Sequence, residues 1–110
     1  MGLTCVVRSL MDAVTKELNV INGSNEVHIQ GERIGIDTEN IDEFVRLVKD
    51  DGTVAAEATV MSSDAQTITC KFETPPEAGV YTLVVSARNG CRATLAPAVS
   101  TVKNITVKVG

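Results

Sequence analysis

Apolar and polar residues alternate along most of the chain after Asn25, in short segments separated by turn residues. The turns recur about every 8 to 12 positions, a spacing typical of β-sandwiches and barrels. The two clearest segments place these residues on one face each: Ile68, Cys70 and Phe72, then Tyr81, Leu83, Val85 and Ala87. Because successive side chains of a strand point to opposite sides, we expect these faces to form the core. The pattern predicts an all-β chain.

Further strands are predicted near residues 27–36, 44–48, 54–61 and 102–109. Gly31 interrupts the first of these segments, and a glycine inside a strand indicates a bulge or a close approach of another backbone. The intervening turns are predicted at Asp50-Asp51-Gly52, Pro75-Pro76-Glu77-Ala78-Gly79 and Asn89-Gly90. The first is a hairpin-type turn and the last is a hairpin signal.

The first twenty residues are compatible with either a helix or a strand. Leu3, Val7, Leu10, Val14 and Leu18 recur at helical spacing, so periodicity alone predicts an amphipathic helix over 3–18. A family resemblance described below favours a first strand near 4–11 instead. The residues themselves leave both possibilities open.

The length and composition fit one folded unit. A chain of 110 residues is the usual size of one domain, and no repeat, low-complexity tract or linker divides it, so we predict a single domain over residues 1–110. The 44% hydrophobic and 22% charged residues are close to globular averages. Only 3% of the residues are aromatic, so the core must be built from aliphatic side chains.

The charge balance disfavours nucleic acid as a direct ligand. Ten basic and fourteen acidic residues give a net charge of −4, and no run of Lys or Arg forms a basic stripe. The N-terminal stretch lacks a basic start and is interrupted by Arg8 and Asp12, so neither a signal peptide nor a membrane span is predicted. We expect a cytoplasmic protein.

Three cysteines, Cys5, Cys70 and Cys91, lie far apart in the sequence. Their odd number and the absence of a C-x-x-C pair argue against a disulfide framework or a zinc site. Reduced thiols in a cytoplasmic protein are the simplest interpretation. Cys70 shares its face with Ile68 and is expected in the core, whereas a pairing of Cys5 with Cys91 stays open.

No catalytic, cofactor-binding or metal-binding residue is assigned from the sequence, and we expect no enzyme activity. Nucleophilic catalysis needs a base beside the nucleophile, yet the only histidine, His28, alternates with Val27 and Ile29 and is expected to be solvated. An acidic loop could offer oxygen ligands to calcium, but it lacks EF-hand spacing and is expected to be solvated: Asp37, Glu39, Asp42 and Glu43.

Two sequons, Asn22-Gly23-Ser24 and Asn104-Ile105-Thr106, match the glycosylation pattern. The motif is short and common, and a cytoplasmic location would leave both unused.

Two stretches carry a family resemblance. The segment ITCKFETPPEAGVYTLVV, residues 68–85, combines a strand, a proline turn and Gly-x-Tyr-x-Leu-x-Val. It resembles Ig-like bacterial domains, in which a tyrosine near the start of strand F anchors a corner; Tyr81 occupies that place. The upstream segment NGSNEVHIQGERIGI resembles the opening of the same family at Ile29, Gly31, Ile34 and Ile36. Together they are similar to the Ig-like domain of unknown function at the C-terminus of bacterial HU-like DNA-binding proteins, over about residues 6–109.

The resemblance implies an immunoglobulin-like antiparallel β-sandwich of about seven strands with no catalytic residues to transfer. It also implies a non-catalytic interaction or assembly module attached to a separate HU-like domain, which is not in this sequence. We expect a protein partner or self-association through an exposed sheet edge or face, without direct contact to nucleic acid or membrane. The alternative is a surface or secreted Ig-like module that binds glycan or protein.

Overall fold

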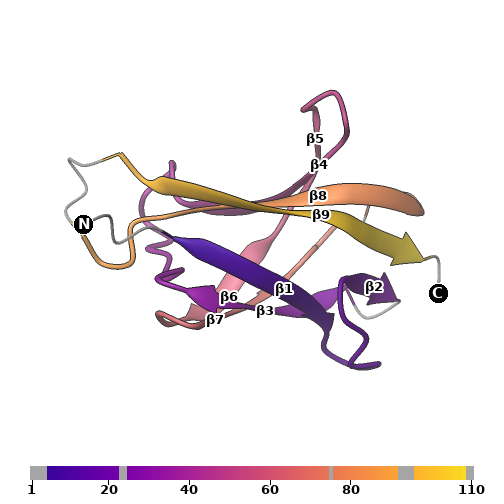
Figure 1. Cartoon of the computed structure of the whole chain (residues 1–110), viewed down its shortest axis with the longest axis horizontal. Coiled ribbons are helices and arrows are strands. Elements are labelled where there is room, and N and C mark those ends of the chain that lie inside the picture. The colour runs from indigo at the N-terminus through magenta and orange to yellow at the C-terminus, as the bar shows by residue number, and fades with distance from the viewer. Residues whose placement is uncertain (1–4, 23–24, 75, 92–95, 109–110) are drawn as a thin grey trace.

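The computed structural model describes residues 5–22, 25–74, 76–91 and 96–108. Within these residues the chain is all-β and forms two sheets (Figure 1). The four-stranded sheet has the order β1-β3-β7-β6, with the strands β1 (Val6–Asp12), β3 (Glu26–Glu32), β7 (Thr67–Lys71) and β6 (Thr59–Ser63). The five-stranded sheet has the order β2-β9-β8-β4-β5, with the strands β2 (Val20–Asn22), β9 (Ala98–Lys108), β8 (Gly79–Ala87), β4 (Phe44–Val48) and β5 (Val54–Glu57).

One hydrophobic core lies between the two sheets, and both contribute to it. The predicted inward residues of β7 and β8 are all buried, as are Phe72 directly after β7 and Val45 and Leu47 of β4. The side chains that are almost completely buried are mostly aliphatic: Phe72, Leu10, Ile21, Ile29, Ile34, Leu47, Ile68, Leu83, Ile105, Val27, Val45 and Val85. The period-two pattern thus located the core correctly. In the described part of the chain, no helix has the length and hydropathy that a membrane span requires.

The N-terminal segment is a strand, so the helix suggested by its periodicity is wrong. Strand β1 pairs antiparallel with β3, and the register shifts at a bulge between Val7 and Ser9. The extra residue puts Val7 and Leu10 on the same inward side although they are three positions apart, which imitates helical spacing. Val14 and Leu18, which would continue a helical stripe, are 71% and 64% exposed.

Gly31 lies opposite this bulge, as the close-approach prediction requires. A Cβ atom added at Gly31 would come within 2.2 Å of the carbonyl oxygen of Val6. Strand β1 therefore reaches its place against β3 only because residue 31 has no side chain.

Three features differ from the predictions. The described residues form nine strands, whereas about seven were expected. The single strand predicted over 54–61 is two strands, β5 and β6, which belong to different sheets and meet at Ala58. Strand β2 pairs with β9 in parallel, so the pairing is not antiparallel throughout. A three-residue strand such as β2 is too short to show an alternation in sequence.

The turn at Asn89-Gly90 is present, but it is not a two-residue hairpin. Both residues have positive φ, 51° and 79°, and the N–H of Cys91 donates to the carbonyl of Arg88 at 3.0 Å. Strand β9 begins at Ala98, well after the turn. This start is nevertheless earlier than the predicted residue 102. The expected end of this strand at Val109 lies outside the described residues.

Candidate functional site

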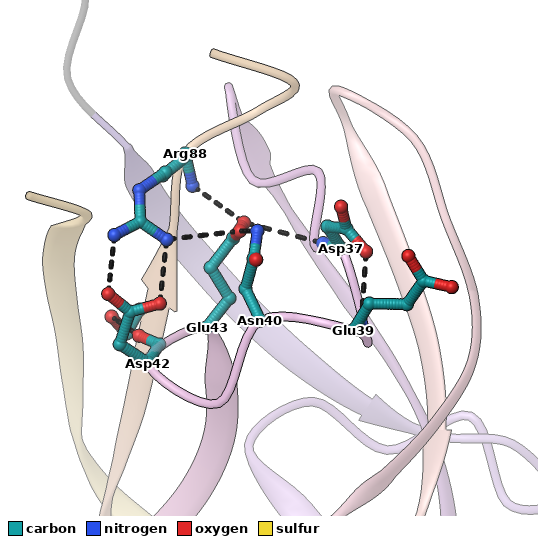
Figure 2. A network of polar contacts seen from close by, with 7 residues as sticks. Asp37, Glu39, Asn40, Asp42, Glu43 and Arg88 are labelled. Carbon is teal, nitrogen blue, oxygen red and sulfur yellow. Dashed lines mark hydrogen bonds and ion pairs between the residues drawn. The ribbon is translucent and has the colours of Figure 1, made fainter. Parts of the chain in front are cut away.

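A polar network at one end of the molecule joins Arg88, which follows β8, to the loop that precedes β4 (Figure 2). The guanidinium of Arg88 forms a two-pronged ion pair with the carboxylate of Asp42, with Nη1 2.6 Å from Oδ1. Its backbone N–H donates to Oε1 of Glu43 at 2.9 Å. The side chains of Arg88 and Glu43 are only 5% and 1% exposed. The network therefore fastens a surface loop to the end of β8.

The carboxyl groups of this network are held in their charged form. Burial alone would raise the pKa of Glu43, but hydrogen bonds from Asn40, Arg88 and Asp37 outweigh it and hold that pKa below its ordinary value. The hydrogen bond from the Arg88 guanidinium lowers the pKa of Asp42. Both acids thus carry a negative charge opposite Arg88 at neutral pH.

The acidic loop acts as a clamp for Arg88. Glu43 is buried, so the expectation that these carboxylates are solvated is wrong for that residue. Its second oxygen accepts from the side-chain amide of Asn40 at 2.6 Å, and Asp37 accepts from the N–H of Glu39 at 3.0 Å. Across the described ranges, no group of three or more His, Cys, Asp or Glu side chains is placed to hold a metal ion.

The other residues weighed from the sequence are dispersed. Cys70 is fully buried in the core, where burial raises the pKa of its thiol to about 12. His28 lies on the outer side of β3, with its side chain 33% exposed and its Nε2 4.0 Å from Glu26. Cys5 is buried and Cys91 is exposed; both are free thiols. Of these groups, the structure brings only Cys5 and Cys91 to a common cavity.

The outer surface of the five-stranded sheet is the strongest candidate for a binding surface. Its residues occupy the positions that alternate with the buried ones along β4, β8 and β9. We call this surface the aliphatic face, and it consists of Phe44, Arg46, Val48, Val80, Thr82, Val84, Val99 and Thr101. Val80 and Val99 are 59% and 61% exposed. Val80 pairs with Thr106 and Val99 pairs with Ser86, so these two residues lie toward opposite ends of the face, with the partly exposed Val48 and Val84 between them. A contiguous exposed apolar surface is a feature of interaction sites.

The aliphatic face is also poor in negative charge. The five strands of this sheet contain one acidic residue, Glu57, although the whole chain has fourteen. Glu57 lies 3.5 Å from Nε of Arg46, and the Arg46 guanidinium stacks 3.7 Å from the centre of the Phe44 ring. A groove of about 320 Å³ crosses the face beside the β4–β5 turn, between Val48 and Val84.

Sequence reasoning missed both the Arg88 network and the aliphatic face. A signal for the face was present, because Val80 and Val84 place apolar side chains on the outer side of the predicted strand. A half-exposed strand normally carries polar residues on its outer side. No comparable signal marks Arg88, whose partners are 45 and 46 positions away in sequence.

No family model matches the chain, and no curated protein matches it. Among solved structures, the chain is similar to a protein from Bacteroides vulgatus described as a "Putative bacterial DNA binding protein". The two structures superpose with a TM-score of 0.79 and 18% sequence identity, over 100% of this chain and 50% of that one. The chain thus spans half the length of the Bacteroides protein. At this identity the likeness is one of fold alone.

Proposed function

We propose that the chain is an immunoglobulin-like β-sandwich that serves as a non-catalytic interaction module beside a DNA-binding unit. Two observations support the fold assignment. The strand orders β1-β3-β7-β6 and β2-β9-β8-β4-β5 correspond to those of immunoglobulin domains, with four strands in one sheet and an extended set in the other. The hydroxyl of Tyr81 donates to the carbonyl of Glu77 at 2.7 Å, the bond expected of a tyrosine corner.

The likeness to half of the Bacteroides protein carries the functional proposal. If the two proteins share an arrangement, the module occupies one half of a longer polypeptide and the other half contacts DNA. The net charge of −4 supports this division, because an acidic module lacks the cations that neutralise phosphates. The resemblance to the C-terminal domain of HU-like proteins leads to the same proposal.

One candidate catalytic pair, His28 with Cys70, is separated in the structure, and this supports the non-catalytic part of the proposal. The only histidine, His28, is on the outer side of its sheet, whereas Cys70 is on the inner side of the same sheet. A nucleophile and its base must be within hydrogen-bond reach to act together.

We further propose that the partner is a second copy of this chain, docked through the aliphatic face. Two copies with a net charge of −4 each repel one another, and the repulsion is weakest where acidic residues are absent. The strands of the sheet that carries the aliphatic face contain one acidic residue, Glu57, which is paired with Arg46. Asp50 lies beside the face, in the wall of its groove, together with Lys49 and Lys103.

Two matched substitutions test this interface. Thr101→Asp puts a charge on the aliphatic face, and Thr69→Asp puts the same charge on the outer side of the four-stranded sheet. Light scattering coupled to size exclusion is expected to show a dimer for the wild type and Thr69→Asp, and a monomer for Thr101→Asp. A wild type that stays monomeric at about 100 µM, a concentration that populates even weak dimers, would contradict the proposal.

The proposed location is the cytoplasm, and the exposed free thiol of Cys91 supports a reducing compartment. The rival is a surface or secreted module, which Asn104 favours because it is exposed within the sequon Asn104-Ile105-Thr106. Mass spectrometry of the protein isolated from its host distinguishes the two: an unmodified Asn104 is expected, and a glycan there would support the rival.

A further inference from the structure

Two of the three cysteines line one cavity at the end of the molecule where β1 begins and β8 ends. The cavity has a volume of about 180 Å³, and its walls include Cys5, Cys91, Ala87 and Ala98. Cys5 directly precedes β1, whereas Cys91 follows the turn after β8. Residues 86 positions apart in sequence therefore bring their thiols to the same space.

The backbone on both sides of the cavity is anchored. Strand β1 is fixed against β3 by the close approach at Gly31 and against β9 by the N–H of Val7, which donates to Oγ of Ser100 at 2.9 Å. On the other side, Asn89 bonds Gly35 twice: its N–H donates to the Gly35 carbonyl at 3.0 Å, and its Oδ1 accepts from the Gly35 N–H at 3.2 Å. Cys91 lies two residues beyond this anchor.

We propose that Cys5 and Cys91 are a thiol modification site, where a small-molecule disulfide converts the pair into a reversible intramolecular disulfide. Both residues border the same cavity of about 180 Å³. A disulfide needs a Cα separation of roughly 4.4 to 6.8 Å, so the bond requires the Cys5 and Cys91 segments to close across this cavity. This inference is independent of the proposed function.

The reaction is two exchanges. The Cys91 thiolate attacks the small disulfide, forming a mixed disulfide and releasing one small thiolate. The Cys5 thiolate then attacks the Cys91 sulfur, forming the internal disulfide and releasing the second small thiolate. Each exchange breaks one S–S bond and forms one, so the two protein thiols are oxidised as the small disulfide is reduced to two thiols.

Exposure sets the order of the two steps. Cys91 is exposed and meets the reagent first, whereas Cys5 is 6% exposed and cannot meet a bulky reagent directly. Burial also raises the pKa of the Cys5 thiol, an effect that the Arg33 charge opposes. Cys70 is an internal control, because the core excludes both the reagent and a partner thiol.

The disulfide would connect the segment before β1 to the loop after β8. Such a long closed loop restricts the unfolded chain strongly, and we expect oxidation to raise the midpoint of thermal unfolding by about 10 °C. In a reducing compartment the bond would form only under oxidative conditions and open again afterwards.

The test is to incubate the folded protein with oxidised glutathione and to map its thiols by alkylation and mass spectrometry. Wild type is expected to lose two free thiols, gain a Cys5–Cys91 linked peptide and retain Cys70. Cys5→Ser is expected to stop at a glutathione adduct on Cys91, without the rise in thermal midpoint. Cys91→Ser is expected to remain unmodified.

Three results would overturn the inference. The first is a wild-type protein that keeps a stable glutathione adduct on Cys91. The second is oxidation that yields only disulfide-linked dimers. The third is an internal disulfide that involves Cys70. Dithiothreitol must also restore three free thiols and the original unfolding midpoint, because the proposed modification is reversible.

Discussion

The two ends of the molecule are both closed around a buried acid, and the two acids hold different partners. At the far end of β1, the carboxylate of Asp12 accepts from the backbone N–H groups of Val14, Thr15 and Asn22, at 2.9, 3.0 and 2.7 Å. At the other end, Glu43 accepts from the backbone of Arg88 and also faces its guanidinium. One acid organises a local turn, and the other joins segments 45 positions apart.

The difference indicates which end is specialised. At the Asp12 end, the bonds from Val14, Thr15 and Asn22 to the Asp12 carboxylate span at most ten positions of sequence. The Arg88 end combines a long-range ion-pair network with a cavity that holds two thiols. We therefore expect substitutions at the Arg88 end to have larger effects, and redox chemistry to be confined to it.

Of the substitutions that test this comparison, Glu43→Ala should lower the free energy of unfolding most. The substitution removes the acceptor for the Arg88 backbone and one of the two carboxylates that face the buried guanidinium. We expect a loss of about 3 kcal/mol in the free energy of unfolding, measured by urea denaturation. The matched control is Glu39→Ala, on the same loop but exposed, which should change stability by less than about 0.5 kcal/mol. Equal effects of the two substitutions would show that the clamp contributes little.

Asp12→Ala should have the second-largest effect, a loss of about 2 kcal/mol in the free energy of unfolding. Three backbone donors lose their acceptor, but Val14 and Thr15 are exposed and can turn to water. Asp12→Asn keeps one acceptor oxygen and should cost less than Asp12→Ala in the same urea titration. A larger effect for Asp12→Ala than for Glu43→Ala would reverse the ranking of the two ends.

Tyr81→Phe should lower stability by about 1 kcal/mol, the value of one net hydrogen bond. The substitution removes the bond to the Glu77 carbonyl and leaves the buried ring in place. Because Tyr81 faces inward, self-association should be unchanged. An unchanged denaturation midpoint would argue against the tyrosine corner.

The smallest effect should be in the pH dependence. The pKa of Glu43 in the fold lies below its ordinary value of 4.5, so the folded state binds this proton less readily than the unfolded state. Its contribution to stability is complete above about pH 4.5 and is lost as the pH falls through the lowered pKa. Glu43→Gln should therefore show a weaker acid dependence of the urea midpoint than wild type between pH 6 and 3. An identical dependence would place the titrating groups elsewhere.

The sequence predicts features of the fold that depend on neighbouring residues. The alternation of Ile68, Cys70 and Phe72 reflects a single strand with one buried side. The glycine at position 31 reflects a single close approach of a neighbouring backbone. The helical spacing of Val7 and Leu10 shows the limit of this reasoning, because a bulge changes the period without leaving a distinct signal.

The candidate sites were harder to predict because they depend on distant pairs. Arg88 meets Asp42 and Glu43 only after β4 and β8 have paired, and Cys5 and Cys91 come to line the same cavity only in the folded chain. The aliphatic face could be suspected from Val80 and Val84. Its extent follows from the register between β8 and its neighbours, which alternation alone does not determine.

The central claim is that this module does not itself contact DNA and works through protein surfaces. The most direct test is fluorescence anisotropy of a labelled DNA duplex titrated with the chain at about 50 mM salt, where non-specific binding is strongest. We predict no change in anisotropy up to about 100 µM protein, the weak limit of typical non-specific affinities. Saturable binding that weakens as the salt concentration rises would contradict the account.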